Sequence, residues 1–188
     1  MGGDIIIRSV ELEDIPGILE VQKDLLLKNK TIVSAKKEGF LVYPIKEEEL
    51  EEIILSESVF LIVAEDKRDI VGYILAYDLE DWRKIKPKWD KRILVIPKVK
   101  DHLNKDKIIY FRHVARKFSY AGVGFKLEEN IYLLAKNKGF KWAIGEILER
   151  PLINEESKKA HEERGYIKIG QADYLDGNFW GLYEKELK

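Results

Sequence analysis

The segment from Ile108 to Gly139 contains the pattern that most restricts how this chain can fold. An apolar run, Ile108–Phe111, leads through a short basic stretch to Gly122 and Gly124, and a long periodic segment follows. A strand, a glycine-bearing turn and a helix in this order form an anion site, because the first N–H groups of a helix lack internal partners and carry partial positive charge. The segment therefore predicts an anion-binding turn at the start of a helix.

The helix in this segment is indicated by apolar residues that recur at steps of three and four. Its expected inner face consists of Val123, Leu127, Ile131, Leu134 and Ala135. Gly139 follows Lys136 and Lys138, where a glycine commonly ends a helix. The glycine spacing alone is also typical of an ordinary tight turn, so the wider context decides its meaning.

Residues 114–124 resemble motif A of the GCN5-related N-acetyltransferases, which reads Val-x-Pro-x-Tyr-Arg-Gly-x-Gly-Ile-Gly. Val114, an aromatic residue at Phe118 and the closing glycines agree with this motif. Arg116, Ser119 and Tyr120 replace its proline, arginine and first glycine. In that family the loop wraps the pyrophosphate of coenzyme A with backbone N–H groups, and such contacts tolerate side-chain changes. The resemblance thus implies acetyl-CoA as co-substrate, with Arg116 or Lys117 supplying the charge of the missing arginine.

A second resemblance lies at residues 154–166. Asn154, Gly165 and Tyr166 occupy the asparagine, glycine and aromatic positions of the family signature Asn-x-x-Ala-x-x-x-Tyr-Glu-Lys-x-Gly-Phe, and Ser157 replaces its small apolar residue. Asn154 is also a good N-cap. Together the two motifs imply these cofactor-binding residues: Val114, Arg116, Lys117, Phe118, Ser119, Tyr120, Ala121, Gly122, Val123, Gly124, Phe125, Asn154 and Ser157.

His161 stands where the family has a tyrosine that protonates the departing thiolate. An imidazole can donate a proton near neutral pH, so His161 is our candidate acid. A histidine that only forms a hydrogen bond at a helix surface is the alternative. The resemblance also makes the N–H of Val114 the donor to the developing oxyanion.

The general base is less well specified. Many relatives use a glutamate on the fourth strand, four residues before the valine, and this chain has Tyr110 there. Glu146 and Glu149, near the end of the predicted strand 140–148, are the nearest carboxylates, and Glu146 is our choice. His113 is another possibility.

The remaining periodicities predict a mixed α/β fold. Strands are expected at 5–10, 59–64, 70–77, 108–114, 140–148 and 176–187, and helices at 11–26, 46–55, 123–138 and 154–164. Together with the resemblance, they predict one domain spanning 1–188, with a twisted sheet of six or seven strands and helices on both faces. Gly72, inside a strand, indicates either a bulge or a close packing contact.

Two segments depart from the family pattern. Residues 28–45 are expected to be irregular, and residues 82–107 are expected to lack any long regular element, with a short strand or a helix turn at 93–96. Residues 28–45 would line the acceptor side of the cleft through Phe40 and Tyr43, unless these only cap the core. Residues 82–107 contain ten Lys or Arg, interrupted by Pro87 and Pro97. This variable basic insertion would contact the acceptor through Trp82 and Trp89, or it is a solvated excursion pinned by these rings.

Composition excludes several classes of protein. The net charge is −1, and a dedicated nucleic-acid binder is usually more basic. The chain lacks cysteine, so thiolate metal sites and cysteine nucleophiles are excluded. His102, His113 and His161 do not have the spacing of metal ligands. Neither a signal peptide nor a membrane span is predicted, which favours a cytoplasmic protein. The abundance of Lys and Glu resembles that of thermophile proteins.

The sequence thus predicts an acetyl-CoA-dependent N-acetyltransferase that acts by direct attack of a primary amine, on a small molecule or a peptide. Two rivals stay open. One is a non-catalytic acyl-CoA-binding sensor. The other is a nucleic-acid-associated protein that uses the basic segment 82–107. A homodimer formed through the final hairpin is also open, and an exposed Phe179–Trp180 pair would support it.

Overall fold

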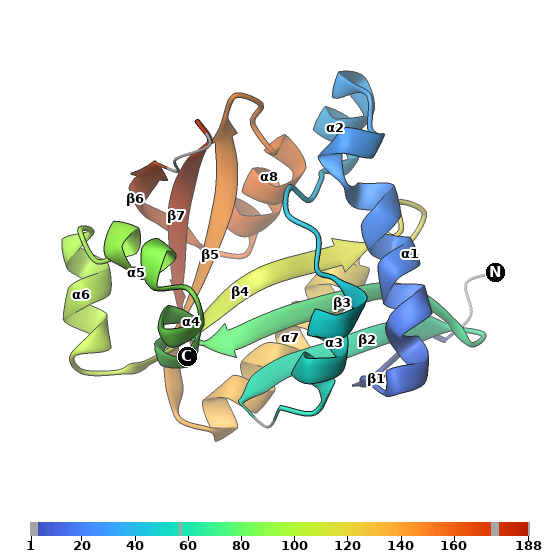
Figure 1. Cartoon of the computed structure of the whole chain (residues 1–188), viewed down its shortest axis with the longest axis horizontal. Helices are drawn as coiled ribbons and strands as arrows, with labels where there is room; N and C mark the ends of the chain where they lie inside the picture. Colours follow the sequence, from blue (N-terminus) through green and yellow to red (C-terminus); the bar gives the residue numbers. More distant parts are fainter. Residues whose placement is uncertain (1–3, 57, 174–176, 188) are drawn as a thin grey trace. The chain divides into compact units, whose positions relative to one another are not determined.

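The computed structural model describes residues 4–56, 58–173 and 177–187, and for Trp89 and Asp90 only the backbone. Its elements are, in order, β1 (Ile6–Ser9), η1 (Leu12–Asp14), α1 (Ile15–Leu25), η2 (Leu27–Asn29), α2 (Ile32–Glu38), α3 (Glu47–Ile54), β2 (Val59–Asp66), β3 (Asp69–Asp78), α4 (Leu79–Ile85), α5 (Pro87–Ile93), α6 (Pro97–Leu103), β4 (Lys107–Arg116), α7 (Val123–Asn137), β5 (Phe140–Arg150), α8 (Glu155–Glu163), β6 (Ile167–Asp173) and β7 (Phe179–Glu186) (Figure 1). None of the helices in this described part of the chain has the length and apolar character needed to cross a bilayer.

The strands form one seven-stranded sheet in the order β1-β2-β3-β4-β5-β7-β6. β4 and β5 are parallel, whereas β1–β2, β5–β7 and β6–β7 are antiparallel. The predicted mixed α/β class is therefore confirmed. The chain divides into two compact units, which are Met1–Ala76 with Arg112–Leu134, and Tyr77–Phe111 with Ala135–Lys188.

The first unit has helices on both faces of its strands. α1 and α3 lie on one face and α7 lies on the other (Figure 1). Of the residues that the periodicity assigned to the inner face of α7, Val123, Leu127, Ile131 and Ala135 are buried, whereas Leu134 is 44% exposed, so its assignment was wrong. Between β2 and β3, Lys67 and Arg68 both have positive φ, as the two central residues of a tight hairpin turn do.

The expectation of an irregular segment at 28–45 was wrong for residues 32–38, which form α2. Thr31 caps the helix, because its side-chain oxygen accepts a hydrogen bond from the N–H of Ser34 at 3.1 Å. Gly39 ends it with a φ of 74°. The loop that follows is held by Gln22, whose side chain makes hydrogen bonds of 2.9 Å and 2.7 Å with both backbone groups of Ile45.

The second unit covers the two faces of β5 and β7 differently. Side chains alternate between the faces along a strand. Gly145 of β5 faces the ring of His161 on α8. Glu184 of β7 lies on the opposite face, where Nε2 of His102 on α6 is 3.2 Å from its carboxylate. α8 therefore covers one face, and the insertion covers the other.

The basic insertion at 82–107 is built of short helices, so the prediction that no long regular element runs through it is confirmed. α4, α5 and α6 succeed one another, and Pro87 and Pro97 stand at the first positions of α5 and α6. Proline is tolerated there because the first N–H of a helix has no partner to lose. Ile96 packs against Gly170 so closely that a Cβ on this glycine would lie 2.8 Å from it. The insertion is thus anchored to the sheet.

Candidate active site

The predicted anion turn lies between β4 and α7 in the first unit. The N–H of Lys117 donates to the carbonyl of Val71 at 2.8 Å, the last contact before the chain leaves the sheet. The N–H of Tyr120 then donates to the carbonyl of Lys117 at 3.0 Å, which closes a turn. Gly122 has a φ of 81°, a conformation that strongly favours glycine. α7 begins at the next residue, so the strand, turn and helix occur in the predicted order.

Gly72 of β3 lets this turn sit close to the sheet. A Cβ at Gly72 would lie 2.9 Å from the carbonyl oxygen of Ala115 and 2.9 Å from Cγ1 of Val123. Of the two alternatives that the sequence offered, the structure confirms close packing. The start of α7 is therefore fixed by β3 as well as by its own turn.

The turn presents backbone rather than side chains to solvent. Ala121 and Gly122 are exposed, and among the described residues neither of their N–H groups donates to another backbone group. Gly124 lies in the first turn of α7, where N–H groups have no partner within the helix. Val123 and Gly124 are themselves buried. These N–H groups, together with the helix dipole, are suited to an anion.

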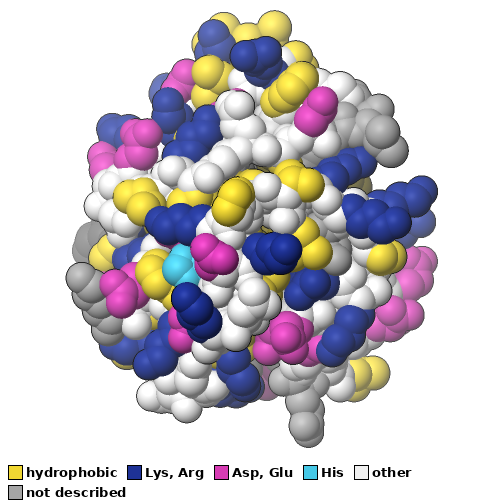
Figure 2. Space-filling view, turned by 90° about the vertical axis from the view of Figure 1, so that its left-hand side faces the viewer, with side chains coloured by type: hydrophobic (Ala, Val, Ile, Leu, Met, Phe, Trp, Pro, Cys, Tyr) yellow, Lys and Arg dark blue, Asp and Glu magenta, His cyan; other side chains and the backbone are white. Residues whose placement is uncertain are grey.

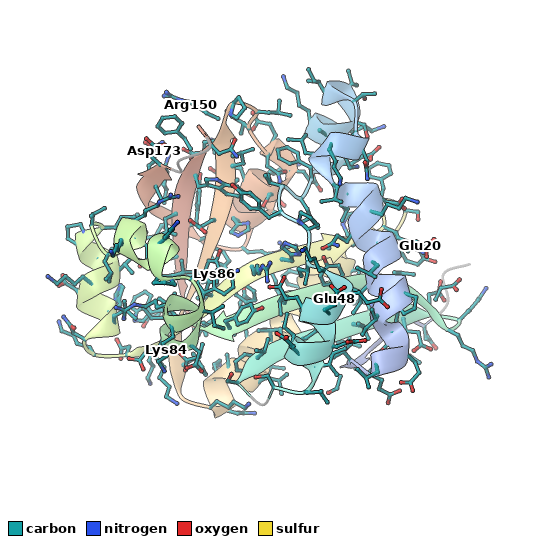
Figure 3. All side chains as sticks on the ribbon, in the orientation of Figure 1. Glu20, Glu48, Lys84, Lys86, Arg150 and Asp173 are labelled. Carbon is teal, nitrogen blue, oxygen red and sulfur yellow. The ribbon has the colours of Figure 1, made fainter. Side chains whose placement is uncertain are left out.

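The charged side chains beside the turn are held by neighbours. Nη1 of Arg116 donates to the carbonyl of Phe118 at 2.9 Å, so the guanidinium braces the turn from within. Nζ of Lys117 lies 3.2 Å from the carboxylate of Glu20, which projects from α1 (Figure 3). The hydroxyl of Tyr120 donates to Asp66 at 3.0 Å. Ser119 and the ring of Phe118 are exposed.

A groove of about 420 Å³ adjoins the turn within the first unit. It is lined by residues of α1, the α1–α2 connection, α2 and the end of β4: Lys23, Asp24, Leu25, Asn29, Lys30, Ser34, Glu38, Arg116, Lys117 and Phe118. Four of these are cationic and two are anionic, so the lining has an excess of positive charge. The hydrogen bond from Nζ of Lys30 to Glu38, at 2.6 Å, contributes to a pKa of Glu38 below its ordinary value. A positively charged groove beside free helix N–H groups is suited to an extended anionic ligand.

The four residues predicted to contact the acceptor have different surroundings. Phe40 is buried, as the alternative of a core-capping residue predicts, whereas the side chain of Tyr43 is 42% exposed. Trp82 of α4 is buried against Tyr77 and Tyr110. The side chain of Trp89 lies outside the described part of the chain. Their contact with an acceptor stays a prediction.

His113, a possible base, is buried within the first unit. Its Nδ1 lies 2.9 Å from the hydroxyl of Tyr73. Burial, followed by the charge of Arg112, lowers the pKa of His113 to about 3, although a hydrogen bond with the backbone of Tyr43 opposes this. Burial also raises the pKa of Tyr73, so the phenol keeps its proton and donates to the ring. His113 therefore joins β3, β4 and the loop at Tyr43, and it is closed to solvent.

His161, the candidate acid, lies on α8 against β5. Its Nδ1 is 2.8 Å from the carbonyl oxygen of Ser157. Because a carbonyl only accepts, Nδ1 carries the ring proton. Burial lowers the pKa of His161 to about 4, which leaves Nε2 unprotonated at neutral pH. This state differs from the predicted role, since the neutral ring has a lone pair at Nε2 rather than a proton to donate.

Glu146, the predicted base, is bonded to the residue that occupies the position of the family's glutamate. The hydroxyl of Tyr110 donates to Oε2 of Glu146 at 2.8 Å. The two strands pair in parallel with Tyr110 opposite Ile144, and Glu146 is two positions further along the same face. Tyr110 and Glu146 therefore lie on one face of β5, and His161 packs against the other at Gly145. The sequence did not predict this bond, because the register of two distant segments determines it.

Glu149, the other carboxylate near the end of β5, has several partners in the second unit. Its oxygens accept from Nζ of Lys168 at 2.7 Å, from Gln171 at 2.6 Å and from the hydroxyl of Tyr183 at 3.1 Å. Burial raises the pKa of Glu149, but these bonds outweigh it and the pKa is below its ordinary value. Such a carboxylate braces β5, β6 and β7 and is poorly suited to accept a proton.

Asn154 and Ser157 form the predicted N-cap of α8, because Oδ1 of Asn154 accepts from the N–H of Ser157 at 3.3 Å. Val114 is half-buried on β4, whose pairing with β5 extends from Lys107 to Phe111. Phe125 is exposed on α7. The binding roles of these residues stay predictions. Across the described residues, no three His, Asp or Glu side chains gather as a metal site.

Comparison with known proteins identifies the fold. No protein-family model and no curated protein matches the sequence. Among solved structures, the chain is similar to an N-acetyltransferase from Staphylococcus aureus Mu50, with 19% identity, a TM-score of 0.66 and coverage of 99% of this chain and 100% of that one.

Two further structures are similar over comparable lengths. The PaiA N-acetyltransferase of Thermoplasma acidophilum, in complex with coenzyme A, has 14% identity and a TM-score of 0.64, covering 97% of this chain and 99% of that one. The ribosomal-protein-S18-alanine N-acetyltransferase of Escherichia coli has 12% identity and a TM-score of 0.63, covering 98% and 94%. The chain therefore has the fold of the GCN5-related N-acetyltransferases.

Proposed function

We propose that this protein is an N-acetyltransferase that uses acetyl-CoA and acts on a primary amine. The observation that carries the proposal is the turn at 119–122, which joins β4 to α7 beside a positively charged groove and in which, among the described residues, the N–H groups of the exposed Ala121 and Gly122 have no backbone acceptor. Those features suit the pyrophosphate of coenzyme A. The binding of coenzyme A by a protein of the same fold supports the assignment.

The proposed reaction is a direct transfer. The amine nitrogen attacks the thioester carbonyl carbon, the amine loses its proton to a base, and the C–S bond breaks with its electrons on sulfur. The N–H of Val114 would stabilise the oxyanion. A thiol of pKa near ~8.5 is a fair leaving group without an acid. Since His161 is neutral with its proton on Nδ1, it would accept a hydrogen bond rather than protonate the sulfur.

The acceptor is proposed only as a small molecule or peptide with a primary amine. Tyr43 is the exposed member of the four residues predicted to contact it. Lysine, amino-terminal peptide, polyamine, aminoglycoside and amino acid are the classes to screen. The acyl-CoA sensor remains the alternative, and it would bind acetyl-CoA without releasing thiol in any of these reactions.

The charge distribution argues against the nucleic-acid alternative. Figure 2 shows Lys and Arg side chains interspersed with acidic and apolar side chains on the face where α5 and α6 lie. Within the insertion, Lys84 is 2.9 Å from Asp81, and Lys98 is paired with Glu184. Lys86, labelled with Lys84 in Figure 3, has its Nζ 5.8 Å from the centre of the Trp82 ring.

Phe179 and Trp180 are half-buried rather than exposed, so the exposed pair that would have supported a homodimer is not present.

Calorimetric titration of acetyl-CoA into the protein and two variants tests the binding site. Ala121→Glu places a carboxylate on the exposed turn without filling buried space, and Ala121→Gln has nearly the same shape without the charge. We expect Ala121→Glu to weaken binding about tenfold or more, through repulsion of the phosphates, and Ala121→Gln to change it less than about threefold. Failure of the unmodified protein to bind acetyl-CoA would refute both the transferase and the sensor.

A further inference from the structure

The groove beside the anion turn is lined by a lysine whose counter-ion is exposed. Nζ of Lys117 lies 3.2 Å from the carboxylate of Glu20, and the side chain of Glu20, labelled in Figure 3, is 63% exposed. We infer that Lys117 is the cation of a subsite for a phosphomonoester, and that Glu20 competes with the phosphate for this cation. The inference rests on the proposed function and adds to it the control of ligand binding by an internal carboxylate.

Lys117 lies where the groove meets the backbone turn. Its N–H donates to the carbonyl of Val71 at 2.8 Å, so the backbone at this residue is fixed to the sheet. Its side chain is 24% exposed and lines the groove, and the turn at 119–122 begins two residues later. A ligand whose pyrophosphate meets the turn can therefore direct a further phosphate to Lys117.

The other cations that line the groove have different surroundings. The side chain of Lys30 is only 6% exposed, and its Nζ donates at 2.6 Å to Glu38, which also accepts a hydrogen bond from within α2. This shielded pair fixes the start of α2 to its end. Nη1 of Arg116 donates to a carbonyl of the turn at 2.9 Å, and Lys23 is exposed near the end of α1. Lys117 differs from Lys30 because its carboxylate partner can move into solvent.

The charge of Glu20 determines which anions can replace it. An exposed ion pair between long side chains contributes little to stability, because water screens both charges. A ligand carboxylate has the same single charge as Glu20 and lacks the advantage of being attached to the protein. A phosphomonoester carries a charge of about −1.5 to −2 at pH 7 and has three acceptor oxygens. It is therefore attracted to Lys117 more strongly than a carboxylate is.

Calorimetric titrations of acetyl-CoA into the full chain and its variants test this competition. Glu20→Gln removes the competing charge, Lys117→Gln removes the cation, and a double variant combines the two. Asp24→Asn is the matched control, because it removes a carboxylate from the same helix and from the lining of the same groove, and among the described residues no ion pair joins Asp24 to Lys117. Each titration is repeated with acetyl-3′-dephospho-CoA, which keeps the pyrophosphate and lacks the monoester.

We expect Glu20→Gln to tighten the binding of acetyl-CoA about threefold or more, because the phosphate no longer has to displace a carboxylate. Lys117→Gln should weaken it about fivefold or more. The double variant should bind within about twofold of Lys117→Gln alone, since Glu20 acts through this cation. Asp24→Asn should change the affinity less than about twofold.

Two sources of the phosphomonoester are distinguished by the same proteins. If it is the 3′-phosphate of the coenzyme, the effects of Glu20→Gln and Lys117→Gln should vanish with acetyl-3′-dephospho-CoA. If it is carried by the acceptor, the effects should be absent with both coenzyme forms. They should then appear in titrations of a phosphoserine peptide with a free amino terminus into protein saturated with acetyl-CoA, and be absent with the unphosphorylated peptide.

Several results would overturn the inference. If the unmodified protein binds acetyl-CoA and the variants change the binding of neither the coenzyme nor the phosphopeptide, the subsite is refuted and the proposed function stands. Equal effects on acetyl-CoA and acetyl-3′-dephospho-CoA would assign Lys117 to the pyrophosphate instead. A Glu20→Gln effect that persists without Lys117 would show that net charge, rather than competition, controls binding. If the unmodified protein does not bind acetyl-CoA, the proposed function fails together with the inference.

Discussion

The surroundings of His113 and of His161 give the same charge state but different chemistry. Both imidazoles are buried, and burial is the largest cause of a lowered pKa in each, to about 3 for His113 and about 4 for His161. In the first unit, Nδ1 of His113 is engaged by Tyr73 and the ring also bonds with the backbone of Tyr43. In the second unit, Nδ1 of His161 is bonded to the carbonyl of Ser157, and Nε2 faces a glycine and has no hydrogen-bond partner among the residues that the structure describes.

This difference shows that a perturbed pKa does not by itself identify a functional histidine. An imidazole whose two nitrogens both form hydrogen bonds has a structural role, because each bond connects it to a particular neighbour. An imidazole with one hydrogen-bonded nitrogen is fixed in its tautomer, and its second nitrogen still has a lone pair that can accept a hydrogen bond. Three experiments compare the two histidines. The first lowers the pH so that the unfolded rings take up protons, the second fills the space next to the His161 ring, and the third removes the hydrogen-bond partner of His113.

The largest expected effect is a loss of stability in mild acid. Both rings are neutral when folded, and unfolding returns them to an ordinary pKa near 6.5, so the unfolded state binds more protons below that pH. Stability is therefore fully present above about pH 6.5 and is lost as the pH falls toward 4 for His161 and toward 3 for His113. Each ring contributes about 1.4 kcal/mol per pH unit, so the free energy of unfolding should fall by roughly 2–3 kcal/mol between pH 6 and pH 5.

Urea unfolding at pH 7, 6 and 5 measures this slope. His161→Phe should remove about half of it, because one of the two titrating rings is gone, and His113 accounts for the remainder. The series ends at pH 5, where Asp14 and Glu149, whose pKa values are lowered in the folded protein, are still mostly ionised in the unfolded state as well. A slope near zero in the unmodified protein would mean that both rings are charged when folded, which would contradict the neutral state assigned to the two histidines.

The next effect is a loss of stability when the space between His161 and Gly145 is filled. Gly145→Ala would place a Cβ 2.8 Å from Nε2, and overpacking of this kind should destabilise the protein by about 2–3 kcal/mol. Gly145→Ala combined with His161→Ala relieves the clash, so the double variant should cost at least about 1 kcal/mol less than the sum of the single variants. Additive costs, measured by urea unfolding of all three, would show that the ring does not lie against this glycine.

Local signals in the sequence predicted the parts of the fold that local chemistry determines. The turn before α7 and the Asn154 cap of α8 both follow from residues within a few positions of each other. The helices missed in 28–45 and 82–107 are each seven residues long, too short for an apolar period to be evident. Thr31 followed by Ser34, and the prolines that open α5 and α6, were available signals that were not used.

The candidate site was predictable only in part, because its key contacts are non-local. Tyr110 and Glu146 meet through the register of two strands separated by 36 positions, which no motif encodes. The tautomer of His161 depends on a carbonyl one helical turn earlier, so the residue type suggested an acid while the geometry gives an acceptor. Backbone contacts at the anion turn, in contrast, depend on glycine and strand order, and the sequence carries both.

The smallest effect tests the structural role of His113. Tyr73→Phe removes the donor to Nδ1 of His113 and leaves a fully buried acceptor without this bond, which should destabilise the protein by about 1–2 kcal/mol. His113→Phe in the same background removes the stranded acceptor, so the double variant should recover part of the loss. For contrast, Tyr166→Leu removes a ring that packs 4.6 Å from His161 and also faces Nζ of Lys185, and it should show no such recovery when His161 is also replaced by phenylalanine. Equal recovery in both pairs, measured by urea unfolding, would mean that His113 is held by packing alone and that the two histidines do not differ.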